Sequence, residues 1–123
     1  MIAPSELRIG NYVLIGSLVW TPIDGILSSQ VFACNGVGIN YIDIDPIPIT
    51  PEWLERLGFE TKTGYVIMGR IGLSPTTWID IMNNGTAEVC GQWNESVAVS
   101  PCKYIHELQN LYHALTGNEL KAK

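Results

Sequence analysis

The sequence predicts an α+β fold, and three patterns support this class. The C-terminal segment 103–120 has apolar residues at a helical period, and segment 50–58 carries the signals of one short helix. Most of the chain between residues 7 and 99 reads as short strands separated by glycine. We therefore expect small, strongly bent antiparallel sheets, a short central helix, and a C-terminal amphipathic helix packed on a sheet.

The C-terminal helix is predicted from a single apolar arc. At about 100° per residue, one arc of roughly 120° holds Tyr104, Ile105, Leu108, Leu111, Tyr112 and Leu115. His106 and His113 fall outside the arc, so we expect them on a solvated helix face. They are about 10 Å apart along the axis, too far to bind one metal ion, and we expect no metal site. Gly117 is expected to end the helix, because glycine takes left-handed backbone without steric cost.

Short strand candidates fill the N-terminal part of the chain, at 7–15, 17–23, 30–33 and 37–44. Gly10-Asn11 predicts a bulge or a tight bend in the first of them. Pro22 limits the second to an edge or an end, because proline has no N–H to donate to a ladder. Strands this short, with little sequence between them, favour an SH3-like half-barrel.

The central helix has local signals at both ends. Thr50 is a good N-cap, Pro51 suits the first helical position, and Gly58 ends the helix. Beyond it, 60–68 reads as a hairpin turning at 63–64, and 77–82, 86–93 and 97–99 read as strands. Asn84-Gly85 predicts a type I′ turn between two of these strands. No repeat or linker interrupts the chain, so we expect a single domain, 1–123.

Composition limits the partners and the compartment. With 123 residues, a net charge of −5 and seven scattered basic residues, the chain does not suit binding of bulk nucleic acid. Its three cysteines, Cys34, Cys90 and Cys102, form neither a disulfide framework nor a zinc pair and read as reduced thiols. The N-terminal MIAPSELRIG has no basic region followed by an apolar run, so we expect a cytoplasmic protein without a membrane anchor.

One arginine and several aromatic residues are the candidates for a ligand site. Arg70, flanked by Gly69 and Gly72, can offer its guanidinium and backbone N–H groups to a phosphate, although a twisted strand with one exposed arginine is the simpler interpretation. Trp78 and Trp93 flank the Asn-Gly hairpin and fit a core, a subunit interface or a ligand site. For a nucleotide-type ligand we expect Arg70, Lys62 and one of the two tryptophans, Trp78 or Trp93.

Catalytic signals are weak. Serines and histidines occur, but no GxSxG elbow or other local motif joins them into a triad. We therefore expect no catalytic residues and no cofactor, and a non-catalytic protein is favoured over a small hydrolase.

Three segments, LRIGNYV at 7–13, PIPITPEWLERLGF at 46–59 and YIHELQNLYHALTGNEL at 104–120, carry a resemblance to a known group of proteins. Together they resemble small uncharacterised proteins encoded by bacteriophages and prophages of Bacteroidales-type gut bacteria. The resemblance implies a phage-derived accessory protein in the host cytoplasm. It implies no established activity and no catalytic residues.

Three function hypotheses follow and stay open at this point. The first is a non-catalytic phage accessory protein, acting in counter-defence by sequestering a nucleotide-type ligand or by blocking a host protein. The second is a homo-oligomeric protein–protein interaction module with no small ligand, which buries the C-terminal helix or the tryptophan hairpin between subunits. The third is a small hydrolase.

Overall fold

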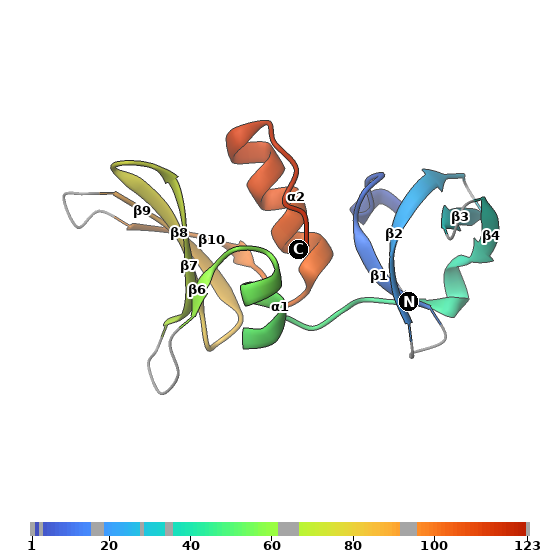
Figure 1. The fold of residues 1–123 in the computed structure, drawn as a ribbon, viewed down its shortest axis with the longest axis horizontal. Coiled ribbons are helices and arrows are strands. Elements are labelled where there is room, and N and C mark those ends of the chain that lie inside the picture. The colour runs from blue at the N-terminus through green and yellow to red at the C-terminus, as the bar shows by residue number, and fades with distance from the viewer. Residues whose placement is uncertain are drawn as a thin grey trace. The chain divides into compact units, whose positions relative to one another are not determined.

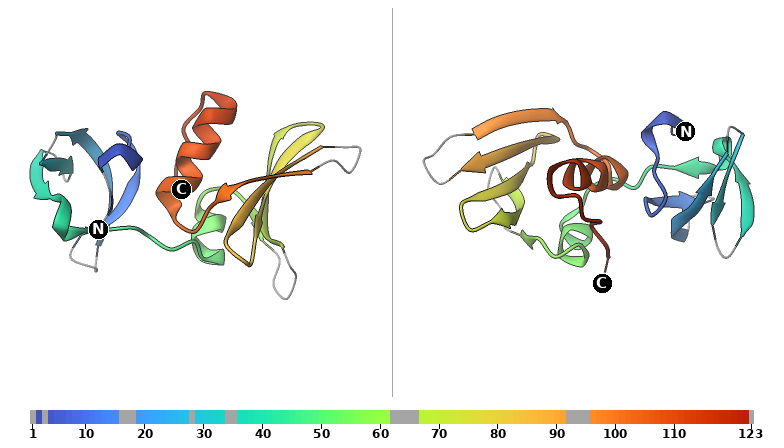
Figure 2. Two further views of the ribbon diagram at one scale, coloured as in Figure 1. Left: turned by 180° about the vertical axis from the view of Figure 1, so that it is seen from behind. Right: turned by 90° about the horizontal axis from the view of Figure 1, so that it is seen from above.

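The computed structural model describes residues 2, 4–15, 19–27, 29–33, 36–61, 67–91 and 96–122. Its backbone divides into two compact units: Met1–Pro48 with Tyr104–Glu119, and Ile49–Lys103 with Leu120–Lys123. Each unit contains a five-stranded antiparallel sheet and one α-helix, which Figures 1 and 2 show from three directions. The predicted α+β class is confirmed. The expectation of a single domain stays a prediction, because compactness does not test whether the units fold independently.

The first unit is built on a strongly curled sheet with the strand order β4-β3-β2-β1-β5. Its elements are η1 (Pro4–Glu6), β1 (Tyr12–Ile15), β2 (Val19–Ile26), β3 (Gln30–Ala33), β4 (Val37–Asn40), η2 (Tyr41–Asp43) and β5 (Ile44–Asp45). The predicted half-barrel is therefore confirmed. The chain bends before β1, as expected, at Gly10, where φ is +97°.

Strand β2 lies inside this sheet although it contains a proline. Pro22 pairs with Tyr12 at the last position of the β1 ladder, and the ladder with β3 begins at the next residue, Ile23. The missing N–H therefore falls where one ladder ends and the next begins. The first half of β2 pairs with β1 and the second half with β3, and the sheet curls around a buried apolar cluster. That cluster consists of Ile2, Leu7, Val13, Ile23, Val31, Tyr41 and Ile44.

The C-terminal helix α2 (Ile105–Thr116) belongs to the same unit and packs on β1, as predicted. Gly117 ends it with φ +75°. The predicted apolar arc is only partly correct. Ile105 and Leu108 are fully buried, but Leu115 is 45% exposed.

Two polar residues of α2 that the arc leaves outside are buried. Gln109 is 1% exposed, and its polar atoms have partners in the protein: Oε1 accepts from the Tyr12 N–H at 2.8 Å and Nε2 donates to the Gly10 carbonyl at 3.1 Å. The side chain supplies the hydrogen bonds that the bent backbone before β1 lacks. His106 is also 1% exposed, so the expectation of a solvated face is wrong for this histidine.

The second unit has the strand order β10-β9-β8-β7-β6, with every neighbouring pair antiparallel. Its elements are α1 (Pro51–Arg56), β6 (Glu60–Thr61), β7 (Ile67–Ser74), β8 (Thr77–Met82), β9 (Thr86–Gly91) and β10 (Ser96–Pro101). A hairpin is present here as predicted, but β6 pairs with residues 69 and 70, beyond the expected end at 68, and the expected turn at 63–64 lies outside the described residues.

Helix α1 forms as its local signals predict. The Thr50 hydroxyl accepts from the Trp53 N–H at 3.3 Å, Pro51 opens the helix, and Gly58 follows it with φ +91°. Leu54 packs against β7 at Gly69, where a β-carbon would lie only 2.8 Å from Leu54 Cδ1. Glycine at this position therefore allows the helix to approach the strand closely.

The β8–β9 hairpin is present as predicted, but its turn differs from the expected type I′. The Gly85 N–H donates to the Met82 carbonyl at 3.2 Å, so Asn83 and Asn84 occupy the centre of the turn. Gly85 follows them with φ +87°. The glycine thus closes a three-residue loop instead of forming half of a two-residue turn. Among the described residues, no helix is long and apolar enough to cross a membrane.

Candidate functional site

Strands β6 to β9 bring four charged residues, Glu60, Arg70, Asp80 and Glu88, to one face of the sheet of the second unit. Cross-strand partners share a face, and the pairs are Glu60 with Arg70, Arg70 with Asp80, Asp80 with Glu88, Gly72 with Trp78, and Trp78 with Cys90. We call this surface the Arg70 face. The alternate residues of β8, Ile79 and Ile81, are buried on the opposite face.

Arg70 and Asp80 form a two-pronged ion pair. Arg70 Nε lies 2.6 Å from Asp80 Oδ1, and Arg70 Nη2 lies 3.0 Å from Asp80 Oδ2. The carboxylate side chain is 4% exposed and the arginine side chain 42%, so the pair has a buried anion and a half-open cation. The hydrogen bond that Arg70 donates to Asp80 raises the pKa of Arg70, which stays charged under all ordinary conditions.

Trp78 supplies the surface beneath the guanidinium. The Arg70 Cζ atom lies 4.7 Å from the centroid of the Trp78 ring, within the range of a cation–π interaction. The indole Nε1 is buried, and it has no hydrogen-bond partner among the described residues. A buried donor without an acceptor costs stability, so a tryptophan here is not explained by stability alone.

Cys90 completes the contacts of Asp80 from the next strand. Its Sγ donates to Asp80 Oδ2 at 3.5 Å. Burial first, and then the nearby Asp80 charge, raise the pKa of the Cys90 thiol to about 11. The thiol is therefore almost entirely protonated near neutral pH, which makes it a poor nucleophile.

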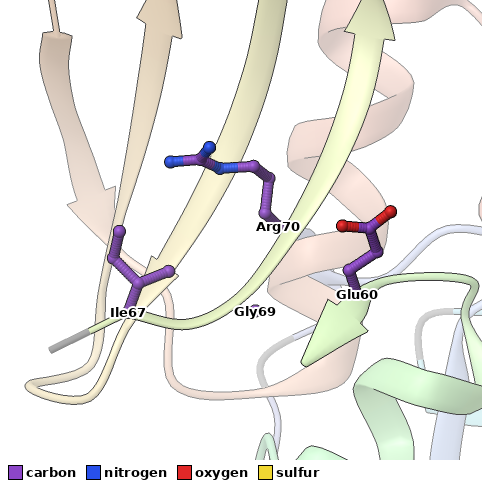
Figure 3. A pocket seen from close by; sticks show the side chains of 4 residues that line it. All are labelled: Glu60, Ile67, Gly69 and Arg70. Carbon is purple, nitrogen blue, oxygen red and sulfur yellow. The ribbon is translucent and has the colours of Figure 1, made fainter. Parts of the chain in front are cut away.

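Glu60 is the cross-strand partner of Arg70 on β6, as Asp80 is on β8, yet Glu60 and Arg70 do not form an ion pair. Figure 3 shows the Arg70 side chain extending away from Glu60. Both prongs of Arg70 are directed to Asp80, and the carboxylate of Glu60 has no hydrogen bond within the part of the chain that the structure describes. A small cavity of about 50 Å³ lies beside Glu60 and Arg70, and Ile67 and Gly69 complete its lining.

A larger, open depression adjoins the same pair. Its volume is about 240 Å³, and its lining includes Glu60, Arg70, Gly72, Ser74, Thr77 and Trp78. Gly72 is exposed, and a β-carbon at this position would meet no atom within 4 Å. The absence of a side chain at Gly72 therefore keeps this part of the depression open.

The four residues expected from the sequence to bind a ligand have different outcomes. Arg70 and Trp78 lie together on the Arg70 face, as the hypothesis requires. Lys62 and Trp93 lie outside the described residues. The cross-strand partner of Trp78 on β9 is Cys90.

Sequence reasoning missed Asp80, Glu60 and Gly72 as parts of this site. Asp80 stands alone between Ile79 and Ile81 in the centre of a strand, and an acidic residue at such a position needs a partner. That signal was present in the sequence. Among the described residues, no three histidine, cysteine, aspartate or glutamate side chains are grouped to hold a metal ion.

Comparison of the whole chain with known proteins adds no relative to this description. No protein-family model matches it, and neither a curated protein nor a solved structure does. The resemblance to phage proteins therefore stays a prediction that rests on the three segments named above.

Proposed function

We propose that the chain is a non-catalytic binding protein that takes a small nucleotide-type ligand on its Arg70 face. The observation that carries the proposal is the fixed, half-open guanidinium of Arg70 beside an open depression. Asp80 uses two of the five N–H donors of Arg70, which leaves three for a ligand. The ion pair and the Trp78 ring hold the guanidinium in one orientation before any ligand arrives.

The chemistry of this face supports binding rather than turnover. The raised pKa of Cys90 disfavours a thiolate nucleophile, and Asp80 is already committed to Arg70 and Cys90. In the phage setting that the resemblance implies, a protein of this kind acts in the host cytoplasm. It sequesters a nucleotide-type signal and so counters a host defence.

Native mass spectrometry tests this proposal without requiring that the ligand be identified beforehand. The purified protein is incubated with a small-molecule extract of bacterial cells, and we expect a retained mass that reappears unaltered after denaturation. Arg70→Lys is the informative variant, because lysine can still pair with Asp80 but lacks the second edge of the guanidinium. We expect it to fold and to lose the ligand. Equal retention by both proteins would remove Arg70 from the site.

A second candidate is a protein–protein interaction module, and exposed apolar residues on edge strands favour it. Val97 on β10 is 66% exposed and Val37 on β4 is 55% exposed, and both strands lie at the end of a sheet. Edge strands present unpaired backbone groups to a partner, which is either a second copy of the chain or a host protein. A mass that rises with concentration, and that falls in Val97→Lys, would favour a homo-oligomer.

A further inference from the structure

Glu60 and Arg70 bring opposite chemistry to the lining of one depression. Arg70 contributes N–H donors. Glu60 contributes a carboxylate, which in its ionised form has only hydrogen-bond acceptors. A ligand that satisfies both must carry acceptors and donors next to each other. An inorganic anion carries acceptors alone and leaves Glu60 unmatched.

The charge of the Arg70 face also disfavours a phosphate in the depression. Glu60, Asp80 and Glu88 share the face with a single described cation, Arg70, whose charge is already balanced by Asp80. A phosphate group in the depression would bring further negative charge beside the Glu60 carboxylate, with Glu88 adding to the negative charge of the same face. A neutral planar group meets no such repulsion.

We propose that the depression binds a guanine base, held between Arg70 and Glu60. This inference rests on the proposed ligand-binding function and names the chemical class of the ligand. Guanine presents O6 and N7 as a pair of acceptors, which matches the free donors of an arginine. On the adjoining edge its N1–H and N2–H₂ groups donate, which matches a carboxylate. Adenine has a donor, N6–H₂, where guanine has the acceptor O6. Cytosine offers the carboxylate only one donor group, N4–H₂.

Gly72 is the residue that leaves room for the base. It lies opposite Trp78 on the Arg70 face, and its backbone is not in the left-handed region, so other residues can adopt it. A β-carbon here would meet no atom within 4 Å, so we expect a valine to fill space in the depression without displacing the Arg70–Asp80 pair. Valine also suits a strand better than glycine, so the variant is expected to fold.

NMR titration of the ¹⁵N-labelled protein tests the inference, with the Trp78 indole and Arg70 Nε signals as reporters and Trp78→Phe for assignment. We expect guanosine to shift both signals saturably, cytidine to do so more weakly, and adenosine and inorganic phosphate to leave them unchanged. Glu60→Gln should weaken guanosine binding roughly tenfold or more, because the amide offers a donor where the carboxylate only accepts. Glu88→Gln removes the same charge from the same face and should change the affinity less than about threefold.

The outcomes separate this inference from the proposed function. Equal shifts with adenosine, or shifts with phosphate alone, would overturn the guanine assignment and leave binding at the Arg70 face standing. If none of the four compounds moves the reporters, the guanine assignment is also overturned, and the retained mass in the native experiment decides the binding function by itself. Similar losses in Glu60→Gln and Glu88→Gln would show a general charge effect and exclude recognition by Glu60.

Discussion

Arg70 lies between two acidic cross-strand partners, Glu60 on β6 and Asp80 on β8, and forms its ion pair with Asp80, through contacts of 2.6 and 3.0 Å. The pair joins a nearly buried carboxylate to a cation that keeps 42% of its side chain exposed. This relationship fixes the guanidinium over Trp78 and leaves Glu60 beside the depression. The stability of the second unit and the proposed site therefore depend on the same contact.

Removal of Arg70 should destabilise the protein more than removal of another arginine that also lies over a tryptophan. Arg70→Ala leaves the Asp80 carboxylate buried without its cation, and we expect a loss of about 2–3 kcal/mol, reduced from the fully buried case because water reaches the site. Arg56, 5.2 Å from the centroid of the Trp53 ring, is an exposed residue on α1 and provides the control. Arg56→Ala should cost less than about 1 kcal/mol.

Urea unfolding of both variants measures this difference, provided that the dependence on urea concentration is unchanged. Equal losses in the two variants would show that Asp80 does not depend on Arg70.

Cys90 should react slowly with alkylating reagents in the folded protein. Its pKa of about 11 leaves a thiolate fraction at pH 8 that is about 100-fold below that of a thiol with an ordinary pKa. The alkylation rate should rise with pH until the pH approaches the pKa of the thiol. Mass spectrometry of the Cys90 peptide after iodoacetamide treatment follows this rate, with urea-unfolded protein as the control. Folded and unfolded rates that agree at pH 8 would contradict the burial of this thiol.

His106 should make the folded state sensitive to mild acid. Burial lowers the pKa of its imidazole, and neither ring nitrogen has a hydrogen-bond partner among the described residues. Glu6 Oε1 lies 3.8 Å from Nε2, too far for a hydrogen bond, and with Glu107 it only partly opposes the effect of burial. The unfolded chain therefore binds the proton more readily, and stability that is present above the ordinary histidine pKa is lost as the pH falls toward the lowered value.

Urea unfolding at pH 7.5 and pH 5.0 tests this expectation. His106→Phe keeps a ring in place without a titrating group and should lose less stability than the wild type on acidification. His113 has a side chain that is 42% exposed, and its replacement by asparagine should leave the acid sensitivity unchanged. The prediction fails if His113→Asn removes the sensitivity and His106→Phe does not.

Replacement of the buried Gln109 should destabilise the protein more than replacement of an exposed glutamine. Gln109→Ala leaves the Tyr12 N–H and the Gly10 carbonyl without their side-chain partner, at an expected cost of about 1–3 kcal/mol. Gln30 makes an exposed side-chain hydrogen bond to Asn40 and is the matched control, with an expected loss below about 0.5 kcal/mol. Thermal unfolding of the two variants measures the contrast, and a smaller loss in Gln109→Ala than in Gln30→Ala would contradict it.

Features set by neighbouring residues could be predicted from the sequence. The N-cap of α1 at Thr50, the glycines that follow both helices, and the alternation along β8 each depend on a few adjacent positions. The burial of Gln109 and His106 could not be predicted in this way. Their environment depends on segments about 100 residues away in the chain, such as the bend at Gly10.

The register that forms the site depends on one extra residue. Ser74 pairs with Thr77 across the Pro75-Thr76 turn, and an unbroken ladder from there would place Arg70 opposite Ile81. A bulge between Gly72 and Ser74 shifts the register, so that Arg70 faces Asp80 instead. The sequence marks both strands and the arginine, but no local signal indicates that the extra residue is Leu73.

The depression beside Arg70 is proposed to bind a guanine base. The most direct test compares the affinity for guanosine of the wild type with that of a variant whose added side chain fills the depression. Isothermal titration calorimetry of the wild type and Gly72→Val provides this comparison, with urea unfolding to confirm that the variant is folded. We predict saturable binding to the wild type and at least roughly tenfold weaker binding to Gly72→Val, because the valine side chain occupies part of the depression. Equal dissociation constants for the two folded proteins, or no binding to the wild type, would contradict the account.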